Sequence, residues 1–237
     1  MSSSVPEWFL TTRWSVVLNA RAADSKKAKA ALETLCGSYW YPLYAFVRRL
    51  GHSPHDAEDL IQGFFAQCIE KNYLHTADQK KGRFRSFLLI ALKRFLANEW
   101  DRARTRKRGG DRQIISLDAE QRYASEPSES LSPDKLYERR WALTLLENVL
   151  AQLKSEQAAA GRAAIFTELQ PFLTSTGRGT PYADISQRLG LSESAIKVAV
   201  HRLRQRYREL LEHEIANTVT SPDEIAEERR YLLTILS

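Results

Sequence analysis

The sequence predicts an all-α protein of two small helical domains joined by a flexible linker. Apolar residues recur at spacings of three and four along most of the chain, which is the helical period, and alternating runs of β-branched residues are scarce. The stretch GGDRQIISLDAEQRYASEPSESLSPD, residues 109–134, is rich in Ser, Glu, Asp and Pro and has little apolar spacing. This linker separates a helical block at 25–108 from a second one at 135–214, with an N-terminal extension at 1–24 and a C-terminal extension at 215–237.

The composition limits the classes of function to consider. The chain has 237 residues, 43% of them hydrophobic and 27% charged, as is usual for a soluble globular protein. Lys and Arg outnumber Asp and Glu by 35 to 29, and a basic surplus permits a polyanionic partner. Cys36 and Cys68 have no CxxC spacing and no nearby His partner, so we expect no disulfide framework, no metal site and no cofactor. No basic leader precedes an apolar core, and no window approaches roughly 18 uninterrupted apolar residues. We therefore expect no membrane insertion and a cytoplasmic protein.

The first block contains a predicted helix whose start is acidic. The segment DAEDLIQGFFAQCIEK, residues 56–71, places apolar residues such as Leu60 and Phe64 toward a core. Its start gathers Asp56, Glu58, Asp59 and Gln62. Acidic residues there stabilise a helix N-terminus, so the spacing alone does not require a partner for them.

The next helix changes character along its length. In FLLIALKRFLANEWDRARTRKRGG, residues 87–110, the early half carries Phe87, Leu88, Ala91 and Phe95 on one side. From residue 93 to residue 108 seven basic residues stand against two acidic ones, and Trp100 lies among them. Aromatic rings between cations are typical of surfaces that stack bases and hold a nucleic-acid backbone, although packing in a core is an equal alternative for Trp100.

The second block contains a helix-turn-helix pattern. In TPYADISQRLGLSES, Thr180 and Pro181 predict the start of a short helix, and Gly190 follows it where a left-handed residue would reverse the chain. Ser192 then caps a longer helix, SESAIKVAVHRLRQRYREL.

The second helix of this pattern separates an apolar face from a basic one. Its apolar stripe consists of Ile196, Val200, Leu203, Tyr207 and Leu210. On the opposite side we expect side chains for base edges, Ser194, Val198, His201 and Gln205, flanked by Lys197 and Arg202 for phosphates. A helical hairpin with a solvated basic face is the alternative, but the turn glycine, the caps and the separated faces together favour a recognition helix in the major groove.

The C-terminal extension predicts one more helix. SPDE, residues 221–224, offers Ser221 as a cap and Pro222 at the first helical position. The helix that follows would carry Ile225, Leu232, Leu233 and Leu236.

Three segments in this order resemble the extracytoplasmic-function (ECF) class of bacterial sigma factors, over about residues 32–212. DAEDLIQGFF is similar to the family's D-A-E-D-L-V-Q-E-x-F, and GRFRSFLLIALKRFLANEWDRAR to G-x-F-x-x-W-L-x-x-I-A-R-N-x-x-x-D-x-x-R-R. YADISQRLGLSESAIKVAVHRLRQRYREL is similar to Y-x-E-I-A-x-x-L-G-x-S-x-x-T-V-K-S-R-L-x-R-A. The resemblance implies a sigma region 2-like helical bundle, a sigma region 4-like helix-turn-helix and no enzymatic activity.

The resemblance also implies the partners and the residues that meet them. Core RNA polymerase and promoter DNA are the implied partners, and an anti-sigma factor or another regulator is compatible with the family. The implied polymerase-binding residues are Asp56, Glu58, Asp59 and Gln62. Those implied for the promoter-proximal element are Lys80, Lys81, Arg83, Arg85, Arg94, Asn98, Trp100, Arg102 and Arg104. Those implied for the promoter-distal element are Ser194, Lys197, Val198, His201, Arg202 and Gln205.

Several positions depart from the family pattern. The family's Asn and Asp of the proximal-element helix fall on Arg94 and Asn98, and Gly63 replaces the usual Glu of the acidic helix. In the recognition helix the family's Thr, Ser and Arg fall on Ala195, Val198 and Ala199. The distal element would therefore be read by fewer polar side chains, and Val198 suits a thymine methyl group.

Two other classes of protein remain as alternatives. A helix-turn-helix transcriptional regulator would bind duplex DNA without acting as a polymerase subunit. An all-α metalloenzyme would draw on His52, His55, Asp56 and Glu58, but their spacing is irregular and no second carboxylate helix pairs with them. The sigma-factor hypothesis explains more of the chain than either.

Overall fold

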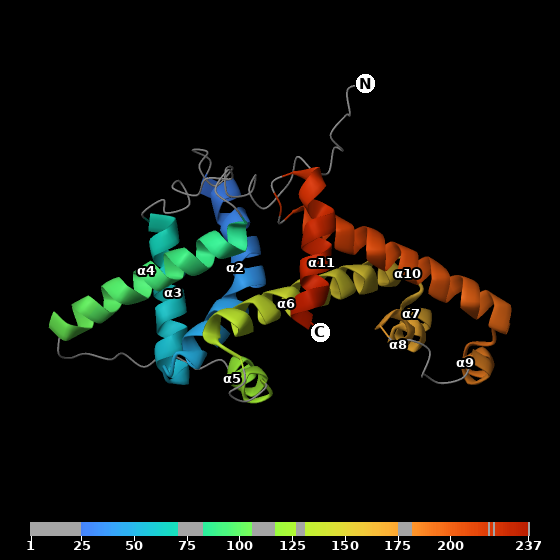
Figure 1. Cartoon of the computed structure of the whole chain (residues 1–237). Helices are drawn as coiled ribbons and strands as arrows, with labels where there is room; N and C mark the ends of the chain where they lie inside the picture. The colour runs from blue at the N-terminus through green and yellow to red at the C-terminus, as the bar shows by residue number, and fades with distance from the viewer. Residues whose placement is uncertain are drawn as a thin grey trace, which may run out of the picture. The chain divides into compact units, whose positions relative to one another are not determined.

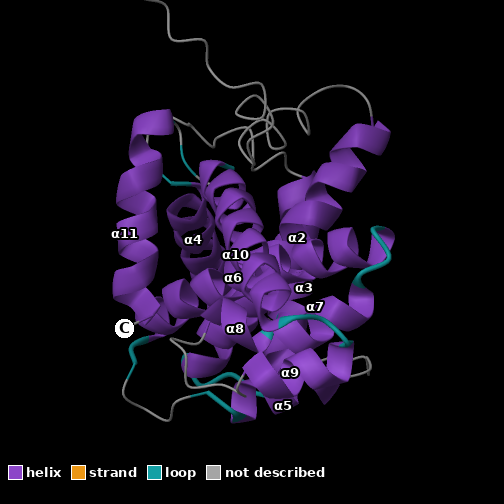
Figure 2. Ribbon diagram, turned by 90° about the vertical axis from the view of Figure 1, so that its right-hand side faces the viewer, coloured by secondary structure: helices purple, strands orange, loops and turns teal. Residues whose placement is uncertain are grey.

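A computed structural model describes residues 25–70, 83–105, 117–126, 131–174, 182–217, 219 and 221–236. Over these residues the fold is helical and contains no strand (Figure 2), so the predicted all-α class is confirmed. The N-terminal extension lies outside the described residues, as do Thr180 and Pro181, the predicted start of the helix-turn-helix. No helix of the described ranges combines the length and the apolar character needed to cross a membrane.

The helices follow one another as Figure 1 shows. They are α2 (Ser25–Arg49), α3 (Pro54–Glu70), α4 (Phe84–Thr105), α5 (Leu117–Ala124), α6 (Pro133–Ala159), α7 (Ala163–Leu169), α8 (Pro171–Thr174), α9 (Tyr182–Leu189), α10 (Glu193–Ala216) and α11 (Ile225–Leu236). A 3-10 turn, Pro222–Glu224, leads into α11.

The chain divides into two compact units. The second unit is Leu145–Glu214, and the first contains the described residues up to Thr144 together with those from Ile215 onward. The first half of α6 and the whole of α11 therefore belong to the first unit. The helix-turn-helix belongs to the second.

Aromatic side chains build the core of the first unit. Tyr39 of α2 meets Phe84 of α4 edge to face at 5.5 Å, and Phe64 of α3 meets Phe95 of α4 at 5.8 Å between ring centroids. Gly63 lies against this contact, because a Cβ added there would come within 3.4 Å of the Phe95 ring. A glutamate at this position, as the family pattern has it, would have to push the Phe95 ring or bend away from it.

Part of the predicted linker is helical and packs on α2. Within 109–134, α5 buries Ala119, and Glu120 accepts hydrogen bonds from the Tyr44 hydroxyl and from Arg48, each at 3.1 Å. Burial, together with this carboxylate, raises the pKa of Tyr44 to about 12. The ring of Tyr123 stands edge to face on Tyr44. The sequence did not predict this helix, because the segment has few apolar residues and its contacts with α2 include hydrogen bonds between polar side chains.

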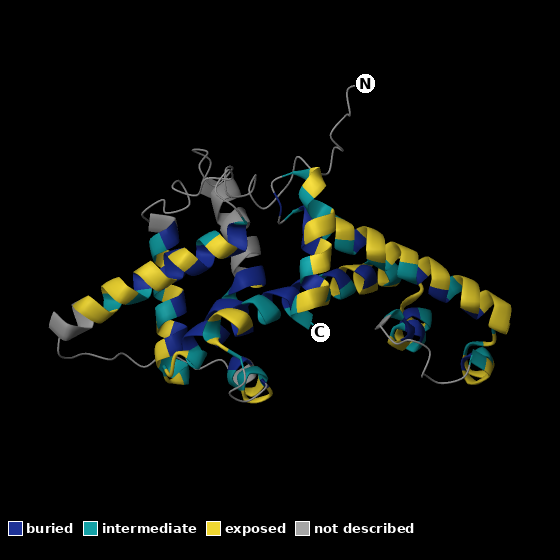
Figure 3. Ribbon diagram, viewed as in Figure 1, coloured by how far each residue is buried: buried dark blue, intermediate teal, exposed yellow. Residues whose placement is uncertain are grey.

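The second unit has its own core. Phe172 of α8 stacks on Tyr182 of α9 at 5.2 Å, and its carbonyl oxygen accepts from Nε and Nη2 of Arg204 at 2.9 and 2.8 Å. The predicted apolar stripe of α10 faces this core, with Tyr207 half-buried and the other four residues buried. Figure 3 shows this division along α10, dark blue on one side and yellow on the other.

The predicted C-terminal helix is confirmed. Pro222 opens the 3-10 turn, and α11 carries the four apolar residues that the sequence placed there. Ser221 has the extended backbone of an N-cap, but its side chain makes no capping hydrogen bond. The start of the helix therefore relies on proline geometry and on Asp223 and Glu224 in the first turn.

Candidate functional site

The acidic residues of α3 fall on two sides of the helix. Asp56, Asp59 and Gln62 are exposed at spacings of three, which brings them onto one side; we call them the acidic face. Glu58 is 5% exposed, which places it toward the interior. Burial and the Glu120 carboxylate are the main causes of the raised pKa of Tyr44 on α2, and the negative charge of Glu58 raises this pKa further. The predicted set of four therefore does not share one surface, because Glu58 lies on the buried side of the helix.

Local contacts order the acidic face. The Ser53 hydroxyl accepts from the Asp56 backbone N–H at 3.1 Å and donates to the Asp56 carboxylate at 2.7 Å, so Ser53 caps α3. His55 Nδ1 lies 3.1 Å from an Asp59 oxygen. The carboxylates thus stabilise the helix start, as the sequence pattern allowed, and remain exposed to a partner.

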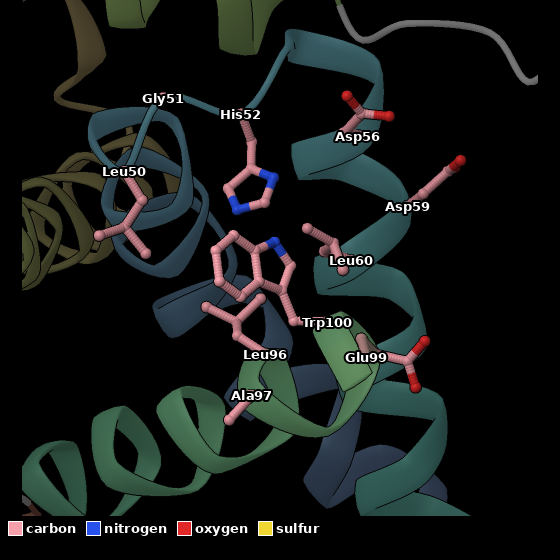
Figure 4. A pocket seen from close by; sticks show the side chains of 10 residues that line it. All are labelled: Leu50, Gly51, His52, Asp56, Asp59, Leu60, Leu96, Ala97, Glu99 and Trp100. Carbon is pink, nitrogen blue, oxygen red and sulfur yellow. The ribbon is translucent and has the colours of Figure 1, made fainter. Parts of the chain in front are cut away.

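An open groove lies beside the acidic face. It has a volume of about 660 Å³ and runs between the α2–α3 turn, α3 and α4. Its lining residues are Leu50, Gly51, His52, Asp56, Asp59, Leu60, Leu96, Ala97, Glu99 and Trp100. Figure 4 shows the Trp100 indole across from the His52 imidazole, with Leu60 and Leu96 beside the indole. The groove therefore combines an apolar wall with an acidic rim.

The predicted proximal DNA residues that the structure describes on the later half of α4 are exposed. Arg94 and Asn98 lie on its outer side, and Trp100 is 71% exposed, so the alternative of a buried packing role is not what the structure shows. Arg102 and Arg104 fall within α4, but their side chains lie outside the described residues, and so do Lys80 and Lys81.

Arg83 and Arg85, also predicted to bind DNA, are engaged by α11. Arg85 is 3% exposed and pairs with Glu228, which is fully buried. Arg83 Nε lies 2.9 Å from the second Glu228 oxygen. Arg85 is thus not exposed in this arrangement, because a carboxylate 143 residues further along the chain occupies its guanidinium, and its contact with DNA stays a prediction.

The helix-turn-helix geometry follows from the turn. Gly190 has φ +64°, the left-handed conformation that ends α9 and reverses the chain. The Ser186 hydroxyl donates to the Leu191 carbonyl at 2.5 Å, which ties α9 to the turn. Ser192 caps α10 by accepting from the Ala195 N–H at 3.2 Å. These contacts fix where α10 begins.

The outer face of α10 presents the residues predicted to read the distal element. All six, Ser194, Lys197, Val198, His201, Arg202 and Gln205, are exposed. The Lys197 ammonium lies 5.9 Å from the Tyr182 ring centroid, and Gln205 donates to Glu209 at 3.3 Å. The face is polar and basic, with Val198 as its exposed apolar side chain.

Sequence reasoning missed the groove and the contact made by α11. Leu50 lies in the α2–α3 turn and Leu96 in α4, and Glu228 comes from a segment without a family pattern, so no local spacing connects them with the residues they meet. In the described ranges no three His, Cys, Asp or Glu side chains are grouped to hold a metal ion.

Comparison with known proteins identifies one domain. Residues 38–106, less than a third of the chain, match the family model described as Sigma-70 region 2. No curated protein and no solved structure matches the chain. The matched range includes α3 and α4, so this part of the chain is similar to region 2 of sigma-70 factors.

Proposed function

We propose that this chain, with its sigma-70 region 2 domain, is a sigma factor of the ECF type that directs core RNA polymerase to specific promoters and opens them. The observation that carries the proposal is the match over residues 38–106, whose helices bear the acidic face and an exposed indole beside basic residues. The basic helix-turn-helix in the second unit supplies a separate surface for duplex DNA. Such a subunit would act in the cytoplasm, without covalent chemistry of its own.

The acidic face suits docking to the polymerase. Asp56, Asp59 and Gln62 point to solvent from one side of a capped helix, so a basic partner meets ordered carboxylates. Complementary charge of this kind guides encounter and fixes orientation more than it adds affinity. Glu58 is buried, so this docking proposal rests on the other three residues.

The two DNA contacts divide between single strand and duplex. In this proposal Trp100, an exposed residue, would stack an unstacked base of the promoter-proximal element, with Arg94 and Asn98 on the same helix. Lys80, Lys81, Arg102 and Arg104 complete the proposed set for this element. On α10, His201 and Val198 would meet base edges of the distal element, while Arg202 and Lys197 hold phosphates.

A charge reversal on α3 tests the docking step. The double variant Asp56→Lys/Asp59→Lys should lose association with core polymerase and run-off transcription, because it presents cations to a basic partner. Binding of the full chain to duplex DNA should not decrease. Pull-down with core polymerase and run-off transcription on a genomic fragment library measure the outcome.

A matched control keeps this test specific. Asp184→Lys/Asp223→Lys changes the net charge equally at exposed positions away from α3 and should keep polymerase association. Circular dichroism checks that losing the Asp56 contact with Ser53 has not unfolded the protein. If the α3 variant still binds polymerase, the docking assignment is wrong. If the wild-type chain binds duplex DNA but never core polymerase, it is a helix-turn-helix regulator instead.

A further inference from the structure

Helix α11 covers part of the surface of the first unit. Its buried residues are Glu228 and Leu232, so one carboxylate and one apolar side chain make its innermost contacts. Glu228 is fully buried, and its two oxygens meet the guanidinium groups of Arg83 and Arg85. The exposed Glu227 carboxylate also lies 3.6 Å from Arg83, so the contact is a buried carboxylate held by two arginines with a second, exposed carboxylate beside one of them.

Aromatic rings complete the site around Arg85. Its guanidinium lies 4.2 Å from the centroid of Trp141 on α6 and 4.8 Å from that of Tyr231 on α11. Arg83 lies 5.1 Å from the same Tyr231 ring, and the Tyr231 hydroxyl donates to Glu138. Tyr137 donates to the Arg85 carbonyl at 2.9 Å. Arg85 is therefore positioned by α6, whereas α11 supplies the anion for both arginines and a second ring.

Two arginines that bind a carboxylate in this way can bind a phosphate equally well. The planar guanidinium donates to either anion through paired N–H groups, and carboxylate and phosphate oxygens compete for the same donors. Arg83 and Arg85 closely follow the basic pair Lys80 and Lys81 in the sequence. The surface beneath α11 is thus an anion site at the start of α4.

We propose that α11 competes with the DNA backbone for Arg83 and Arg85, so that α11 must leave before a promoter phosphate can bind there. The inference rests on the proposed function, in which the start of α4 lies near the promoter-proximal element, and it adds Arg83 and Arg85 to the residues proposed to bind that element. A buried ion pair contributes little net stability, because desolvation offsets attraction, and Leu232 is the buried apolar side chain of α11. The attachment of α11 is therefore suited to exchange for another anion.

The test removes the charge of the intramolecular competitor. Glu228→Gln should raise the affinity of the full chain for a random-sequence 30-base single-stranded DNA about tenfold, within the range usual for coupled sites. The slope of log affinity against log salt should steepen by about one to two, one for each additional phosphate that the arginines bind. Fluorescence anisotropy over a salt series measures both quantities.

Two further variants show whether the increase in affinity acts through the arginines. Asp184→Asn, an equal charge change at an exposed position of α9, should leave affinity and slope as in the wild type. In Arg85→Gln/Glu228→Gln the increase should disappear. An unchanged affinity in Glu228→Gln, or an equal increase in Asp184→Asn, overturns the competition.

If Glu228→Gln does not fold, hydrogen exchange of the wild-type chain tests the proposal instead. Saturating single-stranded DNA should speed exchange of the amides of residues 225–236, and unchanged protection overturns the proposal. None of these assays contains polymerase. Failure here therefore rejects the competition alone, whereas failure to associate with polymerase rejects the sigma-factor function.

Discussion

Trp100 is an exposed aromatic residue in the later half of α4, where basic residues outnumber acidic ones. We expect Trp100→Ala to weaken single-stranded DNA binding by about 1–3 kcal/mol, the usual loss when one stacking ring is removed. Stability should change by less than about 0.5 kcal/mol, because the side chain is mostly solvated. Anisotropy with a single-stranded probe and a urea titration measure the two effects.

Ile90 supplies the matched control for the indole. It is also on α4 and is 51% exposed, but it does not line the groove, so Ile90→Ala should leave DNA affinity unchanged. Equal losses in both variants would mean that exposed apolar area, rather than stacking, determines binding. Loss of polymerase association with normal DNA binding would instead assign Trp100 to the docking surface, since the groove also contains Asp56 and Asp59.

The turn between α9 and α10 is the element whose geometry rests on a single backbone conformation. Gly190 has φ +64°, and nothing lies within 4 Å of a Cβ added there. Gly190→Ala should therefore cost about 1 kcal/mol through the left-handed backbone alone, without a clash. Urea unfolding followed by circular dichroism, with hydrogen exchange over residues 182–210, measures this cost.

A glycine inside a helix gives the opposite expectation. Gly37 lies in α2 without a left-handed φ, and its added Cβ also meets nothing within 4 Å. Gly37→Ala should stabilise the protein by about 0.5–1 kcal/mol, since alanine loses less entropy in a helix. If Gly190→Ala and Gly37→Ala lower the free energy of unfolding equally, the φ of Gly190 is not the cause of the loss.

At the scale of the whole molecule, long-range ion pairs link the helices within each unit. In the second unit Arg206 donates to both oxygens of Glu156, 50 residues away, at 2.9 and 2.8 Å. The hydrogen bonds from Arg206 hold the pKa of Glu156 below its ordinary 4.5. A carboxylate with a lowered folded-state pKa stabilises the fold above the unfolded-state value, and this contribution is lost as the pH falls below about 4.5.

The pH dependence can be isolated with one variant. Glu156→Gln should cost about 0.5 kcal/mol at pH 7, a small value because both side chains are about one third to one half exposed. The wild-type chain should then lose more protection than the variant between pH 5 and pH 3, measured by hydrogen exchange of α6 and α10. Parallel pH profiles would show that the pair does not contribute.

The sequence predicted what depends on local pattern. The apolar stripe of α10, its Ser192 cap and the Gly190 turn each follow from short spacings, and the structure contains all three. It could not predict contacts between distant segments. The burial of Arg85 depends on Glu228, which is far from it in the sequence. The packing of α5 depends on Arg48 and Tyr44 of α2, and no periodic pattern connects these two segments. Of the four residues predicted to bind polymerase, Asp56, Asp59 and Gln62 are exposed on one side of α3, whereas Glu58 is buried, because its orientation depends on the angle at which α3 meets the core.

The position of Trp141 has a spectroscopic consequence. Its ring is almost fully enclosed beneath the Arg85 guanidinium, so its emission belongs to a dry, positively charged environment. Water reaching that ring would shift the emission to longer wavelength. With the other four tryptophans of the chain replaced by phenylalanine, Trp141 would be an optical reporter beside the Arg85–Glu228 pair, and a displacement of the C-terminal helix could be followed in real time without attaching a dye.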